Sequence, residues 1–492
     1  MPACCVAKPA VVIAGGGPTG LMLAAELTLA GVEVVIVEPR ANAELDSSRG
    51  GGLLSRTIEV LDQRGVAQRF VDAGQIHTMY GFGGVFFDVS DLPTRYSFVL
   101  ALPQKQFEPM FADWVLRELG APILRGREVV GFAQDDDGVD VELSDGSSLR
   151  ADYLVGCDGG RSAVRKLAGI DFVGLAPSTS WMIAEGYMDD PPETGFFYDE
   201  VGSHAIRRLD DAGFVGMVLT EREVEHDREP TIDDLRATLV GIYGTDFGLT
   251  TTTFVSRFTD MTRQAATYRA GRVLLAGDAA HIHPPQGGQG MGTGMQDAVN
   301  LGWKLAQVVK GISPETLLDT YQSERHPVAA RVLQNTQAQV LLGRRDERHQ
   351  SLRATMADVL TMDEPRHHIF AMLAALDLHY DFGEGHHLVG RRMPDLDIHT
   401  ADGPTRVFAL MHSAQPVLLN LGTPGAFDVS PWADRVRMVD ATYAGAWELP
   451  VIGAVAAPAA VLIRPDGYVA WAGEPTDPAL REALTFWFGP PR

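Results

Sequence analysis

Three glycines near the start of the chain, Gly15, Gly17 and Gly20, have the spacing of a loop that binds a pyrophosphate. The first permits a tight turn, the second lets a phosphate approach the backbone, and the third lets a helix pack closely on a strand. Glu38 follows 18 residues beyond Gly20, where a carboxylate can accept hydrogen bonds from a ribose diol. The pattern therefore predicts a dinucleotide site formed by Gly15, Gly17, Pro18, Thr19, Gly20 and Glu38.

The elements around these residues must hold them in this order. Residues 10–14 are apolar and rich in β-branched side chains, which is typical of a strand buried on both faces of a parallel sheet. Residues 21–30 favour a helix that Gly31 ends, and residues 34–37 favour a second buried strand. Glycines with this spacing also occur in purely structural turns. The strands, helix, glycines and acid together predict a βαβ unit that binds an adenine dinucleotide.

A second segment with chemical meaning covers residues 271–290. A buried strand ends in Gly277-Asp278, a proline- and glycine-rich loop follows over residues 284–290, and a helix is expected from near Gly294. The N–H groups at the start of such a helix would stabilise an anionic flavin ring. A third segment, residues 153–162, has a predicted strand followed by Asp158-Gly159. Taken alone, the third segment also fits a strand with an ordinary glycine turn.

Together these three segments resemble the FAD-dependent aromatic hydroxylases, single-component monooxygenases related to p-hydroxybenzoate hydroxylase. The resemblance places Asp278 on the ribityl chain or pyrophosphate of FAD, and the backbone N–H groups of Met291 and Gly292 at the pyrimidine edge of the flavin. The family usually has Asn at the position of Gly292, so we expect a looser loop there. The other residues that the resemblance assigns to the cofactor are Arg49, Gln104, Val129, Asp158, Pro285, Gly288 and Gly290.

Three further segments resemble the branch of this family that acts on aromatic polyketides, the angucycline and anthracycline hydroxylases: residues 56–65, 296–304 and 321–327. The resemblance implies hydroxylation of a polycyclic aromatic polyketide through a flavin C4a-hydroperoxide, in antibiotic biosynthesis. Molecular oxygen would be the second substrate. NADPH or NADH would serve as the reductant. It would bind only transiently, because the chain has only one complete βαβ fingerprint and therefore no separate Rossmann domain for it.

Two other functions stay open at this point. Some relatives use the same fold for Baeyer–Villiger oxygen insertion, and a non-enzymatic dinucleotide-binding or redox-sensing protein is a third interpretation. The sequence assigns no catalytic residue. Tyr80, His204 and Arg207 lie in the expected substrate region, but each is more simply interpreted as a structural or surface residue.

The predicted fold is α/β, with a Rossmann-like FAD-binding domain, an inserted antiparallel β-sheet substrate domain and a C-terminal thioredoxin-like domain. No cysteine follows Cys157, so a Cys-x-x-Cys redox role in the last domain is excluded. We expect that domain to be structural, and a homodimer interface is one use for it. Residues 407–411 and 460–463 are predicted strands within it, with a hairpin turn at 465–467. The expected boundaries are 1–172 for the first part of the FAD domain (76–100 contributing to the substrate domain), 173–260 for the substrate domain, 261–385 for the second part and 386–492 for the C-terminal domain.

Composition excludes several other classes of protein. The 492 residues are 45% hydrophobic and 21% charged, as in an ordinary globular chain. A formal charge of −23 disfavours nucleic acid and anionic membrane surfaces as partners. The longest apolar run, residues 451–463, is too short to span a bilayer and contains a proline. Three cysteines, no recognisable export signal and no disulfide framework fit a cytoplasmic protein. Neither a metal site nor a hydrolase triad is expected, and His281 and His283 are interpreted as structural.

Overall fold

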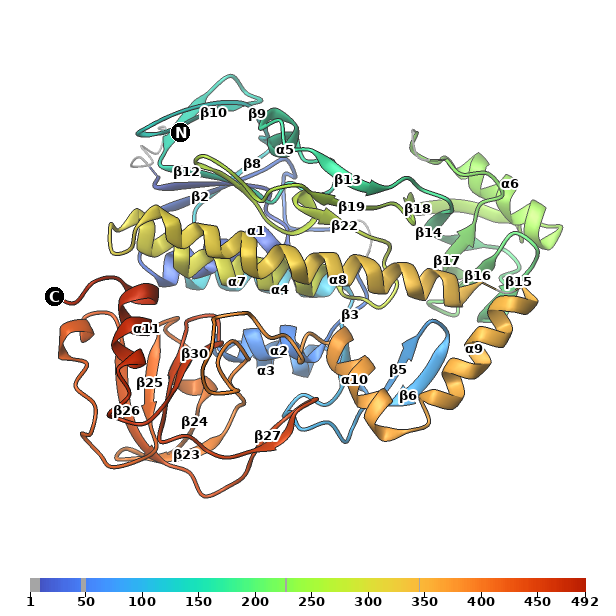
Figure 1. The fold of residues 1–492 in the computed structure, drawn as a ribbon. Coiled ribbons are helices and arrows are strands. Elements are labelled where there is room, and N and C mark those ends of the chain that lie inside the picture. Colours follow the sequence, from blue (N-terminus) through green and yellow to red (C-terminus); the bar gives the residue numbers. More distant parts are fainter. Residues whose placement is uncertain (1–8, 46–49, 226–227, 345) are drawn as a thin grey trace.

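The computed structural model describes residues 9–45, 50–225, 228–344 and 346–492. Figure 1 shows a mixed α/β molecule with long helices across its middle. The first sheet and an antiparallel sheet from the middle of the chain lie towards opposite ends on one side of these helices, and a sheet unit from the last hundred residues lies on the other side. No helix in the described ranges has the length and apolar character needed to cross a membrane.

The first sheet has six strands in the order β20-β21-β12-β1-β2-β8. Its inner strands pair in parallel, and only β20 runs antiparallel to its neighbour. The two central strands are fully buried, as predicted from their unbroken apolar runs. The strands are β1 (Val11–Ala14), β2 (Val34–Glu38), β8 (Ile123–Arg125), β12 (Tyr153–Gly156), β20 (Arg269–Ala270) and β21 (Val273–Leu275).

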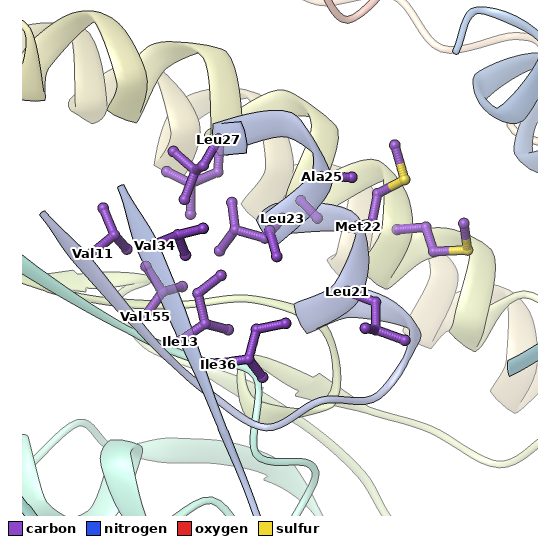
Figure 2. Close-up of a cluster of buried hydrophobic side chains, with 14 of the residues drawn as sticks. Val11, Ile13, Leu21, Met22, Leu23, Ala25, Leu27, Val34, Ile36 and Val155 are labelled. Carbon is purple, nitrogen blue, oxygen red and sulfur yellow. The ribbon is translucent and has the colours of Figure 1, made fainter. Parts of the chain in front are cut away.

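Two helices, α1 (Pro18–Leu29) and α7 (Gly290–Val309), pack against each other beside this sheet. Figure 2 shows Leu23 and Leu27 of α1 facing Val11 and Val34 of the strands, so one face of α1 covers the sheet. The opposite face of α1 is buried as well, which explains why this helix is mostly apolar. The main hydrophobic core therefore lies directly beneath the glycine loop.

The elements between β2 and the middle of the chain surround the core. A three-stranded antiparallel sheet, β11-β10-β9, packs near the first sheet, while β5 and β6 form a separate hairpin. The helices are α2 (Ser55–Asp62), α3 (Ala67–Ala73), α4 (Gln104–Asp113), continued by a π-helical turn (Trp114–Glu118), and α5 (Ala163–Leu167). The strands are β3 (Gly52–Leu53), β4 (Gln75–His77), β5 (Met79–Phe82), β6 (Val85–Asp88), β7 (Val99–Ala101), β9 (Val129–Asp135), β10 (Gly138–Leu143) and β11 (Ser148–Ala151).

The middle of the chain forms the antiparallel five-stranded sheet that its alternating pattern predicts, in the order β15-β16-β17-β14-β18. Helix α6 (Ile232–Tyr243) starts with a capping box at Thr231 and buries Leu235 and Leu239 against this sheet. The strands are β14 (Ser180–Met188), β15 (Gly195–Tyr198), β16 (Ser203–Arg208), β17 (Phe214–Thr220) and β18 (Leu249–Thr259). A small connecting sheet contains β13 (Phe172–Leu175), β19 (Thr262–Ala265) and β22 (His281–Ile282).

Three helices follow α7 and run along the molecule: α8 (Asp319–Gly343), α9 (Glu347–Val359) and α10 (Asp363–Leu373). The C-terminal unit then forms a six-stranded sheet, β24-β23-β26-β25-β29-β30, with α11 (Ala479–Phe488). Two hydrophobic clusters flank this sheet, because Val417 and Leu419 face one and Leu418 faces the other. Its strands are β23 (Asp397–Thr400), β24 (Gly403–Arg406), β25 (Val417–Asn420), β26 (Arg437–Thr442), β29 (Ala460–Ile463) and β30 (Val469–Gly473), beside a β27–β28 hairpin (Trp447–Leu449, Gly453–Val455).

Two expectations about individual elements were wrong. Residues 407–411 were expected to be a strand, but Phe408–Met411 is a short 3₁₀ helix. A short apolar run does not distinguish a buried strand from a buried helical turn, because both bury apolar side chains. Phe408 is fully buried in this turn. Helix α7 begins at Gly290, four residues before the expected start near Gly294. The strand at 460–463 and the hairpin turn after it are confirmed.

Candidate active site

Three strands of the first sheet end side by side. Ala14 of β1 pairs in register with Gly156 of β12, which pairs in turn with Leu275 of β21. Because the strands are parallel, the loops that follow them leave the sheet at the same edge. That edge is the usual ligand-binding edge of an open parallel sheet. All three predicted cofactor segments therefore meet at one place.

Gly15 and Gly20 have the turn and packing roles that their spacing predicts, while the phosphate role of Gly17 stays a prediction. Gly15 has a φ of +102°, and a Cβ on it would lie 2.3 Å from the carbonyl oxygen of Cys157. A Cβ on Gly20 would lie 2.0 Å from the carbonyl oxygen of Gly15, so helix and loop are in close contact. A Cβ on Gly17 would meet nothing within 4 Å. The open face of the loop at Gly17 fits the approach of a pyrophosphate.

Thr19 joins the first loop to the other two cofactor segments. A Cβ on Gly277 would lie 2.5 Å from Thr19 Oγ1, and a Cβ on Gly294 would lie 2.4 Å from the same atom. Because Gly277 and Gly294 have no Cβ, the backbones of the β21 loop and of α7 can both approach Thr19 closely. This three-way contact holds the starts of α1 and α7 close together, with their first turns at the same site.

The start of α7 supplies the predicted N–H groups. Gly290, Met291 and Gly292 are the first three residues of the helix, so their N–H groups have no carbonyl partner within it. The expected looser loop at Gly292 is wrong, because Gly292 is helical and a Cβ on it would lie 2.4 Å from Thr57 Oγ1. Glycine here makes room for Thr57. The positive end of this helix fits an anionic flavin ring.

Two aspartates lie in the loops after β12 and β21. Asp278 is exposed, in a 3₁₀ turn (Gly277–Ala279), and its carboxylate is accessible to a ligand. Asp158 Oδ2 accepts hydrogen bonds from the N–H groups of Ala163 at 2.7 Å and Val164 at 3.1 Å, at the start of α5. Its Oδ1 is buried and has no hydrogen-bond partner among the described residues. An oxygen in this state fits a ligand hydroxyl or N–H group at the site.

Glu38 lies at the end of β2, where the ribose of a dinucleotide is expected. Its Oε2 accepts the Gly16 N–H at 2.6 Å, and its Oε1 accepts Arg40 Nε at 2.7 Å. Burial alone would raise the pKa of Glu38, but the bonds from Arg40 and Gly16 outweigh it and keep the pKa below its usual value. The carboxylate is therefore charged at neutral pH. Oε1 also accepts the Arg40 backbone N–H at 3.0 Å, so Oε2 is the oxygen with a free lone pair for a ribose hydroxyl.

Arg40 and Glu108 are site residues that the sequence did not reveal. Arg40 forms a 2.6 Å ion pair with Glu108, and Glu108 Oε2 accepts Gln104 Nε2 at 2.9 Å. Gln104, a predicted contact of the ribityl chain, is thus linked through two charged side chains to Glu38. Val129 lies nearby, at the start of β9, two residues after a backbone N–H that bonds to the Glu38 carbonyl. Arg49 lies outside the described residues.

The glycine-rich loop before α7 borders the same site. Pro285 and Gly288 are exposed, and the Tyr80 hydroxyl donates to the Gly287 carbonyl oxygen. Burial raises the pKa of Tyr80 well above its usual range, so its hydroxyl stays protonated. Of the three substrate-region candidates, Tyr80 alone contacts a predicted cofactor segment in the described part of the chain.

The other candidates lie elsewhere. His204 is buried, and its ring nitrogens bond to Asp199 at 3.1 Å and to the Thr220 N–H at 3.1 Å, so its role is structural. Arg207 is exposed on β16. His281 lies against a buried aspartate, and no group of three metal-ligating side chains is found within the described residues.

A small enclosed cavity lies beside the first turn of α7. Thr57 and Gly292 form part of its wall, together with residues of α8 and the end of α10, among them Val328, Val332 and Leu373. The wall is mixed in character, because Gln289, Gln296 and Arg331 lie in it beside these apolar residues. The site thus combines an open glycine loop, a helix N-terminus, exposed and buried carboxylates, and a small cavity with a mixed wall.

Comparison with known proteins covers nearly the whole chain. Residues 8–336 match the family model for an FAD binding domain, and residues 386–491 match that for the aromatic-ring hydroxylase C-terminal domain. A rifampicin monooxygenase from Streptomyces venezuelae is 44% identical over 97% of this chain and 98% of its own length. OxyS, an anhydrotetracycline hydroxylase from Streptomyces rimosus, is 40% identical, with a TM-score of 0.90 and coverage of 98% of this chain and 100% of its own. CabE, an aromatic hydroxylase from angucycline biosynthesis, is 39% identical, with a TM-score of 0.91 and coverage of 99% and 100%.

Proposed function

Because this chain belongs to the family of FAD-binding aromatic-ring hydroxylases and is an FAD-dependent monooxygenase, we propose that it hydroxylates a polycyclic aromatic polyketide. The observation that carries the proposal is the meeting of three glycine-bordered strand ends with the start of α7. Relatives of similar length act on anhydrotetracycline and in angucycline biosynthesis, according to their names, and these support the substrate class. The fold assignments that go with the proposal are a Rossmann-like FAD domain and a thioredoxin-like C-terminal domain.

We assign the two ends of FAD to different parts of the site. The pyrophosphate would lie over Gly17 and the start of α1, with the adenosine ribose at Glu38. The ribityl chain would contact Asp278 and Gln104, and the flavin ring would lie against the loop that holds Pro285. When bound, FAD supplies the activation of molecular oxygen. NADPH or NADH would bring the electrons.

The chain's own residues would orient the ring and keep water out. The N–H groups of Met291 and Gly292 would hold the pyrimidine edge and favour negative charge on it. Apolar residues such as Val332 and Leu373 would limit water at this end of the site. Tyr80 would fix the loop beside the ring through its bond to the Gly287 carbonyl.

The experiment that tests the function couples a cofactor measurement to measurements of turnover and of the product. A mass spectrum of the group released on denaturation should show FAD. NADPH or NADH oxidation and oxygen uptake should rise when a polycyclic polyphenol is added, and the product should be about 16 mass units heavier. Product NMR then separates a new hydroxyl group from the lactone of a Baeyer–Villiger reaction. The proposal fails if no donor and no substrate in the panel produces oxygen uptake by the FAD-loaded protein.

Asp278 offers the simplest test of the cofactor assignment. We expect Asp278→Ala to weaken FAD binding by about tenfold, because a charge-assisted hydrogen bond is worth about 1.5–3 kcal/mol. Asp137→Ala is the matched control, since Asp137 is equally exposed but lies on the remote β9–β10 turn. Equal FAD dissociation constants for the two variants would contradict the role of Asp278.

A further inference from the structure

The loop that carries Asp278 is anchored at both ends by one buried side chain, Asp297 of α7. Asp297 Oδ2 accepts the Gly277 N–H at 3.2 Å and lies 2.6 Å from His281 Nε2. Gly277 comes directly before Asp278, and His281 comes three residues after it. One carboxylate oxygen therefore fixes the two flanks of the turn from below, while Asp278 itself stays exposed above it.

The second oxygen of Asp297 is held by Arg325 of α8. Arg325 Nε donates to Asp297 Oδ1 at 2.7 Å, and both side chains are fully buried. The rest of the guanidinium is engaged as well, with Nη1 bonded to the Tyr380 hydroxyl at 3.0 Å and Nη2 to the Thr293 carbonyl at 3.2 Å. Asp297 has little freedom to rotate, because each of its oxygens bonds to a different element.

The negative charge of Asp297 strengthens its hydrogen bonds to the loop. Burial opposes the charge of Asp297, but Arg325 and His281 outweigh it and hold the pKa of Asp297 below its usual value. The carboxylate is therefore ionised, and hydrogen bonds to an ionised acceptor are about twice as strong as neutral ones. The loop reaches Asp297 only because Gly277 adopts a φ of +63°, which glycine tolerates.

We propose that Asp297 is the positioning residue of the flavin-binding turn at 277–281, and that Arg325 orients Asp297 for this role. The inference rests on the proposed function in one respect, namely that Asp278 contacts FAD. Asp297 itself touches no ligand. Its contribution is to place Asp278, so its removal lowers the affinity for FAD while the fold persists.

The test removes the Asp297–Arg325 ion pair in two double variants. They differ only in whether residue 297 can still accept the Gly277 N–H. In Asp297→Asn/Arg325→Met, the amide oxygen still accepts the Gly277 N–H; in Asp297→Ala/Arg325→Met, nothing does. Replacing a buried ion pair by uncharged residues often leaves a protein folded. We expect FAD titration of the apoproteins to give the Asn variant a dissociation constant within about threefold of the wild type. The Ala variant should bind at least about tenfold more weakly, since an unsatisfied buried N–H is costly.

A matched control separates positioning from stability. Glu26 and Arg64 form an equally buried ion pair with distances of 2.6 and 2.7 Å, and neither bonds to residues 277–281 in the described ranges. Glu26→Ala/Arg64→Met should lower the thermal midpoint of the apoprotein as much as the Asp297→Ala pair, with an FAD affinity within about twofold of the wild type. Equal FAD affinities for the Asn and Ala pairs would overturn the proposal.

A second pair of variants covers the case in which the Ala pair does not fold. His281→Gln keeps an N–H group that can donate to Asp297, whereas His281→Leu removes it without leaving a buried charge of its own. We expect the Gln variant to bind FAD several-fold more tightly than the Leu variant, and equal affinities would again refute the role of Asp297. If instead Asp278→Ala leaves FAD binding unchanged, the assignment of Asp278 fails, which is a different result from failure of the anchor.

Discussion

Lys304 of α7 predicts an unusual dependence of stability on pH. The side chain is fully buried, and its Nζ lies 2.9 Å from both Asn300 Oδ1 and Glu324 Oε1. Burial lowers the pKa of Lys304 from 10.5 to about 8, although the charge of Glu324 opposes the shift. Arg464, another buried cation, adds to the decrease.

The sign of the effect follows from proton binding in the two states. Below pH 8 both folded and unfolded chains hold the Lys304 proton, so the cost of burying the charge is constant. Between pH 8 and 10.5 the unfolded chain holds more of this proton than the folded one, so the free energy of unfolding rises with pH. A shift of about 2.5 pKa units corresponds to roughly 3 kcal/mol, of which about 2 kcal/mol appears between pH 8 and pH 10.

Urea unfolding at pH 8, 9 and 10, followed by tryptophan fluorescence, measures this contribution. Other groups titrate in the same range, so the quantity to compare is the difference between the wild type and Lys304→Met. We expect that difference to change by about 2 kcal/mol in favour of the wild type as the pH rises from 8 to 10. Lys310→Met, at the exposed end of the same helix, is the control and should run parallel to the wild type. Parallel curves for Lys304→Met would refute the reasoning.

Two further predictions concern the glycines of the site. Gly17→Ala should leave the stability of the apoprotein within about 0.5 kcal/mol of the wild type but weaken FAD binding. Gly20→Ala should cost about 2 kcal/mol or more of stability, because its Cβ would lie 2.0 Å from a carbonyl oxygen. Urea unfolding and FAD titration of both variants test this, and equal stabilities would contradict it. Gly294→Ala should destabilise the protein by about 1–3 kcal/mol through contact with Thr19 Oγ1, and Thr19→Ala should relieve most of that loss. If the double-mutant cycle is additive, the two residues have no steric contact of this kind.

The part of the site that was predictable from sequence is the part made of short-range contacts. A buried strand, a glycine loop and a helix follow one another within thirty residues, so their pattern predicts the phosphate loop around Gly15 and Gly17. The anchors of the site are different. Arg40 meets Glu108, and Asp297 meets Arg325, over separations that no local pattern encodes. These pairs form only when the sheet and helices are already packed.

The start of α7 shows a second limit of local patterns. Glycine usually disfavours a helix interior, so the run of glycines at 288–294 points to a loop. In the structure, Gly292 and Gly294 lie in the first turns of the helix because Thr57 and Thr19 leave no room for a Cβ. Packing against two other segments therefore overrides helix propensity. The same close packing places the N–H groups of the helix start at the edge of the sheet where we expect the cofactor.

The segments that resemble polyketide hydroxylases include side chains that hold the C-terminal unit in place. They meet the β29–β30 hairpin of the C-terminal unit, which carries Asp466 and Arg464. Arg56 donates to the Asp466 carbonyl at 2.7 Å, Asn300 lies 3.2 Å from its carboxylate, and Glu324 pairs with Arg464 at 2.7 Å. All of these side chains are buried. The three segments are residues 56–65, 296–304 and 321–327.

Buried charges of this kind constrain sequence strongly, because removing one partner leaves the other unpaired and costs about 3–5 kcal/mol. A recognisable signature at Arg56, Asn300 and Glu324 therefore reports how the C-terminal unit is attached to the flavin domain. We expect it to be independent of which molecule is oxidised, since none of these three side chains lines the cavity beside α7. We therefore expect substrate choice to depend on other residues, in the loop next to Tyr80 and on the antiparallel sheet that the sequence predicts to bind the substrate. Exchanging those residues, with the hairpin contacts kept, is the change expected to alter the substrate without disturbing the fold.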